Sequence, residues 1–294
     1  MASLKEIKGR IASVRSTLKI TSAMKMVASA KLHRAQQAIG NMLPYENRLH
    51  GILVDLMSSK GAGKDCVSGY SLTEQRPVKR VAIVAFSSNS SLCGAFNSNV
   101  IKAAQAVINE YSDAGLLPSD IVVYSVGRKM AEAMRKAGFE SPRDFSKMAD
   151  APSYEAASAL AQELVDRFED GTFDKVELVY NHFKSTSSQP STRQTYLPMS
   201  LPESSAGAGS APDDLIVEPS VEELIATLLP KVVRLRIYST LLDCNAAEHA
   251  ARTVAMQTAT DNGNELLADL TLEYNKGRQQ KITSEILDIV GGTL

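Results

Sequence analysis

Two long segments, one at each end of the chain, constrain the fold more than any other feature of the sequence. In the N-terminal segment, apolar residues recur at steps of three and four, which is the spacing of one face of an α-helix. They are Leu4, Ile7, Ile11, Val14 and Leu18, with a second line at Ile20, Ala23, Val27 and Ala30. Because no proline precedes Pro44, the pattern predicts a helix of about 40 residues, some 60 Å long.

The C-terminal segment has the same character. Pro230 is the last proline, and glycine follows it only at positions 263, 277, 291 and 292, so a helix here approaches roughly 90 Å in length. Its interrupted apolar stripe comprises Ala247, Ala251, Val254, Leu266, Leu270, Tyr274, Ile282, Ile286 and Ile289. Each narrow stripe needs a second helix to cover it, and the simplest solution is that the two segments pair as an antiparallel coiled coil. Alanine buries little area, so we expect the pair to rely on surrounding protein.

The middle of the chain changes character. Strand-like runs at 78–86, 120–126 and 175–183 alternate with helical patterns at 97–112, 128–137 and 153–169. This alternation is typical of an α/β fold with a parallel sheet. We therefore predict a Rossmann-like α/β domain inserted between the two helices of the coiled coil.

Composition then divides the chain into four parts. Serine, glycine, proline and acidic residues dominate 201–220, a mixture that cannot bury enough apolar surface to order itself. The predicted parts are an N-terminal coiled-coil helix at 1–57, the α/β domain at 75–200, a flexible acidic insertion at 201–220 and a C-terminal coiled-coil helix at 221–294.

Charge is balanced overall but unevenly placed. The whole chain has 32 basic and 33 acidic side chains, whereas residues 1–50 hold nine Lys or Arg against two Glu, a balance of +7. Such asymmetry is typical of a partner-binding segment, although a solvated helix face gives the same pattern. Nucleic acid is a poor candidate partner, because no aromatic residues are interleaved with the bases and the bases are spread around the helix.

The compartment follows from what the sequence lacks. No segment has the roughly 20 apolar residues needed to cross a bilayer, so we expect a soluble chain. The N-terminus has no apolar signal core, which argues against secretion. Three cysteines without a CxxC pair suggest neither a disulfide framework nor a thiolate zinc site, and a reducing compartment fits best.

A search for chemistry assigns no catalytic residue, no cofactor site and no metal site. The glycine-rich run at 60–65 lacks the first glycine of a phosphate-binding loop and has Asp65 where a Ser or Thr must hold magnesium. The four histidines lie far apart and form no metal-ligand spacing. Cys93 opens a helix, where the pKa of a thiol is lowered; the simpler interpretation is a small buried residue in a tight turn. A small-molecule hydrolase using Cys93 stays open as an alternative.

Four stretches resemble a known family. They are 11–32, which includes Ser22-Ala-Met-Lys-Met-Val-Ala, 251–263, which begins Ala251-Arg-Thr-Val-Ala-Met-Gln, 270–292, which includes Tyr274-Asn-Lys-Gly-Arg-Gln-Gln, and Ser91-Leu-Cys-Gly-Ala-Phe-Asn. Together they are similar to the γ subunits of bacterial F-type ATP synthases. The central domain outside 92–97 resembles the family only loosely.

The resemblance implies a rotor that catalyses nothing itself. In that family the paired terminal helices form an axle inside a ring of three α and three β subunits, one γ per ring, and the rest of the chain docks on ε and the c-ring. ATP is made or hydrolysed on β, and rotation couples this reaction to ion flow at the cytoplasmic face of the bacterial inner membrane. Implied contacts with the α and β subunits are Met24, Lys25, Arg252, Arg278, Gln279, Thr283 and Glu285. The alternative is a coiled-coil scaffold carrying an α/β domain.

The chain departs from the family at one turn. Asn89-Ser-Ser stands where the family usually has Asp-Arg-Gly. Two charges are therefore absent, and the contacts expected of that Asp and Arg do not carry over to this sequence.

Overall fold

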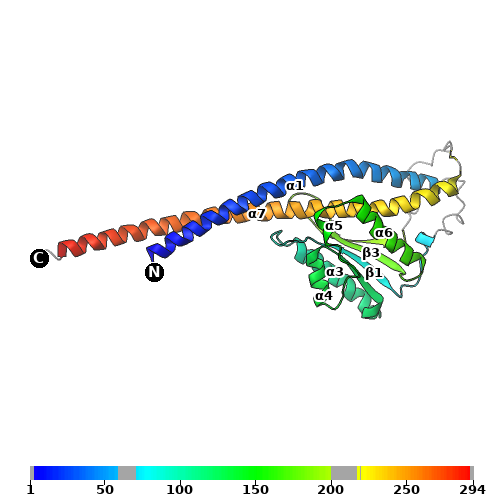
Figure 1. Cartoon of the computed structure of the whole chain (residues 1–294), viewed down its shortest axis with the longest axis horizontal. Helices are drawn as coiled ribbons and strands as arrows, with labels where there is room; N and C mark the ends of the chain where they lie inside the picture. The colour runs from blue at the N-terminus through cyan, green and yellow to red at the C-terminus, as the bar shows by residue number, and fades with distance from the viewer. Residues whose placement is uncertain (1–2, 59–70, 200–216, 219, 292–294) are drawn as a thin grey trace. The chain divides into compact units, whose positions relative to one another are not determined.

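The computed structural model describes residues 3–58, 71–199, 217–218 and 220–291. They form two compact units, residues up to Ala30 together with those from Arg252 onward, and residues Lys31–Ala251. Two long helices, α1 (Leu4–Ser58) and α7 (Val221–Gly291), each contribute one end to each unit (Figure 1). The predicted insertion at 201–220 lies almost entirely outside the described residues. None of the described helices combines the length and the apolar character needed to cross a membrane.

A four-stranded sheet organises the unit at 31–251. Its strands are β1 (Val81–Phe86), β2 (Ile121–Val126), β3 (Lys175–Asn181) and β4 (Ser191–Leu197), in the order β2-β1-β3-β4. β1 pairs in parallel with both β2 and β3, which confirms the predicted α/β class. β4 is antiparallel to β3 and was not predicted. Its alternating polar residues give no buried run, so an edge strand of this kind is hard to distinguish from a loop.

Both faces of the sheet are covered by helices, as a parallel sheet requires. One face packs against α3 (Phe96–Asp113) and α4 (Arg128–Lys136). The other packs against α5 (Ser146–Asp150), α6 (Tyr154–Glu169) and the parts of α1 and α7 that belong to this unit. Figure 1 shows α3 and α4 on the opposite side of the sheet from α6. Short 3₁₀ turns at Ser71–Thr73 and Pro118–Asp120 precede β1 and β2.

Both long helices run through a proline. α1 spans 55 residues with Pro44 inside it, so the prediction of about 40 residues was too short, and α7 begins nine residues before Pro230. An internal proline costs about 3 kcal/mol. Large apolar side chains beyond each proline are buried in the core on this face of the sheet, each stabilising the fold by about 1.5–3 kcal/mol. They are Leu53 and Leu56 of α1 and Ile225 and Leu229 of α7. Burial therefore outweighs the local preference.

A buried carboxylate links α3 to the edge of the sheet. Glu177 on β3 is 1% exposed. Its carboxylate accepts hydrogen bonds from Arg193 Nε at 2.5 Å and Tyr111 Oη at 2.7 Å, and lies 2.8 Å from Lys175 Nζ. Burial alone would raise the pKa of Glu177, but the hydrogen bonds from these three groups outweigh it, and the pKa is held below its usual value.

We expect Glu177→Gln to lower the free energy of unfolding at pH 7 by about 1–3 kcal/mol, because the variant removes the carboxylate partner of Lys175 and leaves Arg193 with only its second partner, Glu110. The folded-state pKa of Glu177 is depressed, so its contribution is complete above the unfolded-state pKa and disappears as the pH falls through the folded value. Urea unfolding at pH 7 and at about pH 3 measures this difference between the two proteins, which should shrink in acid.

Glu132→Gln is the matched control, since Glu132 makes only a surface ion pair with Lys129 at 3.3 Å. Its cost should stay below about 0.5 kcal/mol at both pH values. Equal effects of the two substitutions would contradict the assignment of the buried cluster as the pH-sensitive contact.

Asn89 uses both ends of its amide. Its Nδ2 donates to the backbone carbonyl of Ser146 at 2.7 Å, and its Oδ1 accepts from the backbone N–H of Arg128 at 2.8 Å. The side chain thus joins the loop after β1 to the first residues of both α4 and α5. An aspartate, as in the usual family turn, would still accept from Arg128 but has no proton to give to Ser146.

Asn89→Asp should lower the free energy of unfolding by about 1 kcal/mol, because the backbone carbonyl of Ser146 loses its hydrogen-bond donor. This loss outweighs the favourable effect of a negative charge at the start of α4. Asn109→Asp, at an exposed position of α3, should change stability by less than about 0.5 kcal/mol. Thermal unfolding of the three proteins compares them. An Asn89→Asp variant as stable as the parent would show that the Ser146 contact contributes nothing.

Candidate binding surface on the paired terminal helices

In the unit formed by the chain ends, α1 and α7 run antiparallel. A Cβ added to Gly277 would lie 3.1 Å from Leu4 Cδ2, and one added to Gly263 would lie 2.7 Å from Leu18 Cδ2. Leu4 and Leu18 are 14 residues apart, as are Gly263 and Gly277, so the register is constant over two heptads. Further along, the hydroxyl of Thr260 lies 3.0 Å from that of Thr21. The predicted antiparallel pair is confirmed.

The seam is narrow, with large side chains entering spaces left by small ones. Ile7, Ala28, Met256 and Leu270 are each less than 5% exposed, whereas Ile20 and Val27 are 57% and 58% exposed. The second apolar line of the N-terminal segment therefore lies outside the seam at Ile20 and Val27. One partner helix covers only a single stripe of another, so two adjacent lines cannot both be buried by it.

The end of α7 carries an exposed apolar surface. Leu4, at the start of α1, lies opposite Gly277, so the last turns of α7 extend past α1. Their large apolar side chains are 45–68% exposed: Ile282, Ile286, Leu287 and Ile289. Contiguous exposed apolar residues of this kind mark interaction sites. We call these four residues the apolar tip.

Polar residues accompany the apolar tip. Arg278, Gln279, Thr283 and Glu285 are all exposed there. Thr283 donates its hydroxyl proton to the backbone carbonyl of Gln279 at 2.9 Å, and Glu285 lies 3.8 Å from Lys281. These interactions are local to α7 and weak. The four side chains therefore remain accessible to a partner.

The other three predicted contacts lie elsewhere in the same unit. Met24 and Lys25 are half-buried on α1. Arg252 is 9% exposed. The structure thus gathers four of the seven predicted residues at one end of α7 and separates the other three from them. Their contacts with partners stay a prediction.

Cys93, the cysteine considered for catalysis, is packed inside the α/β domain. Cys93 is 1% exposed, and its sulfur lies 3.2 Å from Asn97 Nδ2 and 3.8 Å from Ser88 Oγ. These contacts make it a small side chain within a tight turn. Over the ranges that the structure describes, no cluster of three or more His, Cys, Asp or Glu is placed to hold a metal ion.

An antiparallel helix pair with an exposed apolar end, carried by the same chain as an α/β domain, defines a subunit of a larger assembly. The family model described as ATP synthase matches residues 3–294. The ATP synthase γ chains of Phocaeicola vulgatus and Bacteroides fragilis are 56% and 53% identical, each over 100% of both chains. The chain belongs to the ATP synthase γ-chain family, so it is a subunit of an enzyme complex, and the resemblance predicted from its motifs is confirmed.

Solved structures share the fold. The rotor of the Euglena gracilis mitochondrial ATP synthase in rotational state 1 matches with a TM-score of 0.61 at 20% identity. The alignment covers 95% of this chain and 98% of that one. The long terminal helices and the central, mostly parallel sheet are therefore a fold that this structure shares.

Gly263→Val should destabilise the helix pair by about 1–3 kcal/mol, because the added side chain meets Leu18 and forces the seam apart. Gly9→Val is the matched control: a Cβ at Gly9 meets nothing within 4 Å, so the same substitution should be neutral or slightly stabilising there. Circular dichroism at 222 nm during thermal unfolding measures both. A Gly263→Val protein that melts like the control would contradict the close contact.

Proposed function

We propose that this chain is the noncatalytic central-stalk rotor of an ATP synthase. The observation that carries the proposal is the antiparallel pair of terminal helices with its apolar tip, in a chain similar over its full length to ATP synthase γ chains. In this role the pair turns inside a ring of three α and three β subunits, one copy per ring. The ε subunit and the c-ring of the membrane sector bind the rest of the chain.

The mechanism requires an asymmetric rod rather than a reactive group. Three identical β subunits around such a rod meet different side chains at any instant, and each shifts toward the conformation that its contacts favour. The apolar tip supplies contacts that are not directional, so successive orientations remain similar in energy. Exposed bases on α1, such as Lys8, Arg15 and Lys19, supply charge contacts that solvent screens and that release readily.

Seven side chains are proposed to contact the ring. Arg278, Gln279, Thr283 and Glu285 would hydrogen-bond the lining of the ring beside the apolar tip. Met24 and Lys25 would meet a moving loop of β. Arg252, which is 9% exposed, would hydrogen-bond the lining of the ring.

The proposed location is the cytoplasmic face of the bacterial inner membrane. Its support is that the two γ chains named above are from bacteria, and that rotation must be coupled to ion flow through a membrane sector. The chain would be held there by its partner subunits.

Reconstitution with its own α and β subunits tests the proposal. We expect a particle whose native mass contains one copy of this chain for three α and three β subunits, with an ATPase rate different from that of the ring alone. A chain that stays outside a competent ring, or enters it without changing turnover, would refute the rotor assignment.

Arg278→Ala combined with Gln279→Ala tests the predicted contacts. Losing two hydrogen-bonding side chains at the tip should lower ATP turnover of the reconstituted particle by about five- to tenfold while one copy still assembles. Lys102→Ala, which removes an exposed base from α3, should leave turnover unchanged. If the double variant equals this control, these two residues are not contacts that matter for turnover.

A further inference from the structure

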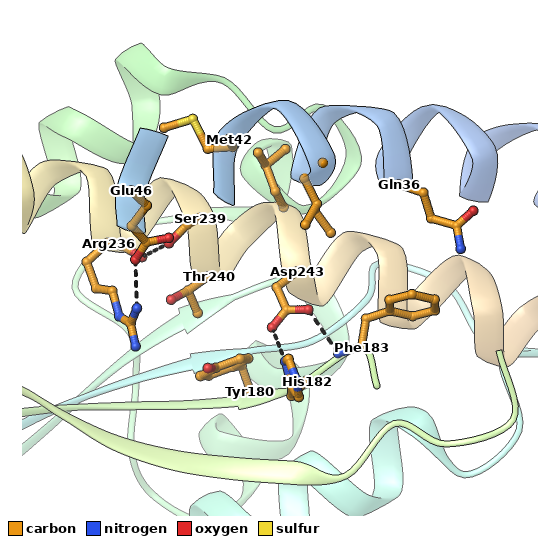
Figure 2. A pocket seen from close by; sticks show the side chains of 13 residues that line it. Gln36, Met42, Glu46, Tyr180, His182, Phe183, Arg236, Ser239, Thr240 and Asp243 are labelled. Atoms are coloured by element: carbon orange, nitrogen blue, oxygen red, sulfur yellow. Dashed lines mark hydrogen bonds and ion pairs between the residues drawn. The ribbon is translucent and has the colours of Figure 1, made fainter. Parts of the chain in front are cut away.

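A cavity of about 450 Å³ lies within the 31–251 unit, between α1, α7 and the end of β3. Ile39, Gly40 and Met42 of α1 line it on one side, and Tyr180 and His182 line it on the other. Figure 2 shows Thr240 and Asp243 of α7 pointing toward Tyr180 and His182. This volume is in the range of cavities that take a small organic molecule.

Hydrogen-bonded pairs fix the walls of this cavity. Arg236 of α7 donates to Glu46 of α1 at 2.6 Å. Asp243 of α7 accepts the backbone N–H of Phe183 at 2.9 Å, and its other oxygen lies 2.6 Å from His182 Nδ1. Both α1 and the segment after β3 are thus tied to α7. A ligand entering the cavity would meet a site that is already formed, which lowers the cost of binding.

Two largely buried residues each present a hydroxyl at the wall of the cavity. Tyr180 is 7% exposed and Thr240 is 3% exposed, and both line the cavity. In the described part of the chain, neither hydroxyl has a hydrogen-bond partner. A ligand group that hydrogen-bonds these hydroxyls replaces water in the cavity and breaks no bond within the protein. Burial raises the pKa of Tyr180, so its phenol stays protonated and able to donate.

The remaining lining selects the kind of ligand. Apolar side chains of Ile39, Met42 and Phe183 provide surfaces for a ring. Two carboxylates, Glu46 and Asp243, stand against a single guanidinium, which disfavours an anion. We propose that this cavity is a binding site for a neutral, flat ring compound that hydrogen-bonds the hydroxyls of Tyr180 and Thr240 through a polar group at its edge. None of the seven residues proposed to contact the α and β subunits lines this cavity, so binding by the free chain is tested separately from those contacts.

The neutral fluorescent amine 1-aminoanthracene is a suitable probe, tested on the full chain. We expect saturable binding with one site per chain and a blue-shifted emission, because the dye leaves water for an apolar cavity. The anionic dye 1-anilinonaphthalene-8-sulfonate should bind this site more weakly, because it brings a negative charge beside two carboxylates.

Filling the cavity should remove the site. A Cβ at Gly40 meets nothing within 4 Å, so Gly40→Leu places a side chain in the cavity without a backbone clash. It should abolish the saturable signal. Gly40→Ala, with the same gain in helix propensity but little volume, and Gly51→Leu, at another uncrowded glycine of α1, should both retain binding.

Removing the hydroxyls tests the recognition itself. Tyr180→Phe and Thr240→Val keep the shape of each side chain and should each weaken the affinity by about three- to tenfold. The proposal is overturned by the absence of saturable binding, which would mean a cavity filled by water only. It is equally overturned if Gly40→Leu binds the dye as the parent does, because the dye then lies elsewhere, such as on the apolar tip.

Discussion

The unit formed by the two chain ends depends on one contact, the close approach of leucine to glycine along the helix pair. Leu4 and Leu18 enter spaces left by Gly277 and Gly263, and the interval of 14 residues is the same on both helices. A seam built from small residues buries little area for each residue, so its stability is modest. Its register is nonetheless well defined, because a shift would place a leucine against a side chain larger than hydrogen. Glycine lowers helix propensity here and in return permits close packing.

The same two helices are stabilised differently in the 31–251 unit. There they cover a sheet, and leucine, isoleucine and valine are buried beside alanines, so the buried side chains are larger on average. The larger apolar area explains how both helices continue through a proline without interruption. Ion pairs such as Glu46 with Arg236 add specificity between the helices. One pair of helices thus has a strongly packed part and a lightly packed part, each with its own composition.

Much of this arrangement could be predicted from periodicity. The strands at 81–86, 121–126 and 175–181 and the helices on either side of the sheet follow the alternation of apolar runs. The errors came from positions that tertiary contacts decide. Pro44 locally predicts the end of a helix, whereas α1 continues past it because its later turns are buried. The alternating polar residues of 191–197 resemble a loop, although they form an edge strand. The cavity could not be predicted at all, since His182 and Asp243 are far apart in sequence and meet only through the fold.

The sequence placed the apolar residues at the end of α7 in the seam between the two helices, but the structure leaves them exposed. A stripe of apolar residues predicts that a surface is buried, but it does not identify the chain that buries it. Ile282, Ile286 and Ile289 continue the spacing of Leu270, yet α1 has already begun at the level of Gly277. The apolar pattern of α7 therefore continues beyond the turns that α1 covers in the described residues. Exposed apolar residues of this kind mark interaction sites, so the periodic pattern alone could not separate a surface buried within the chain from one left exposed.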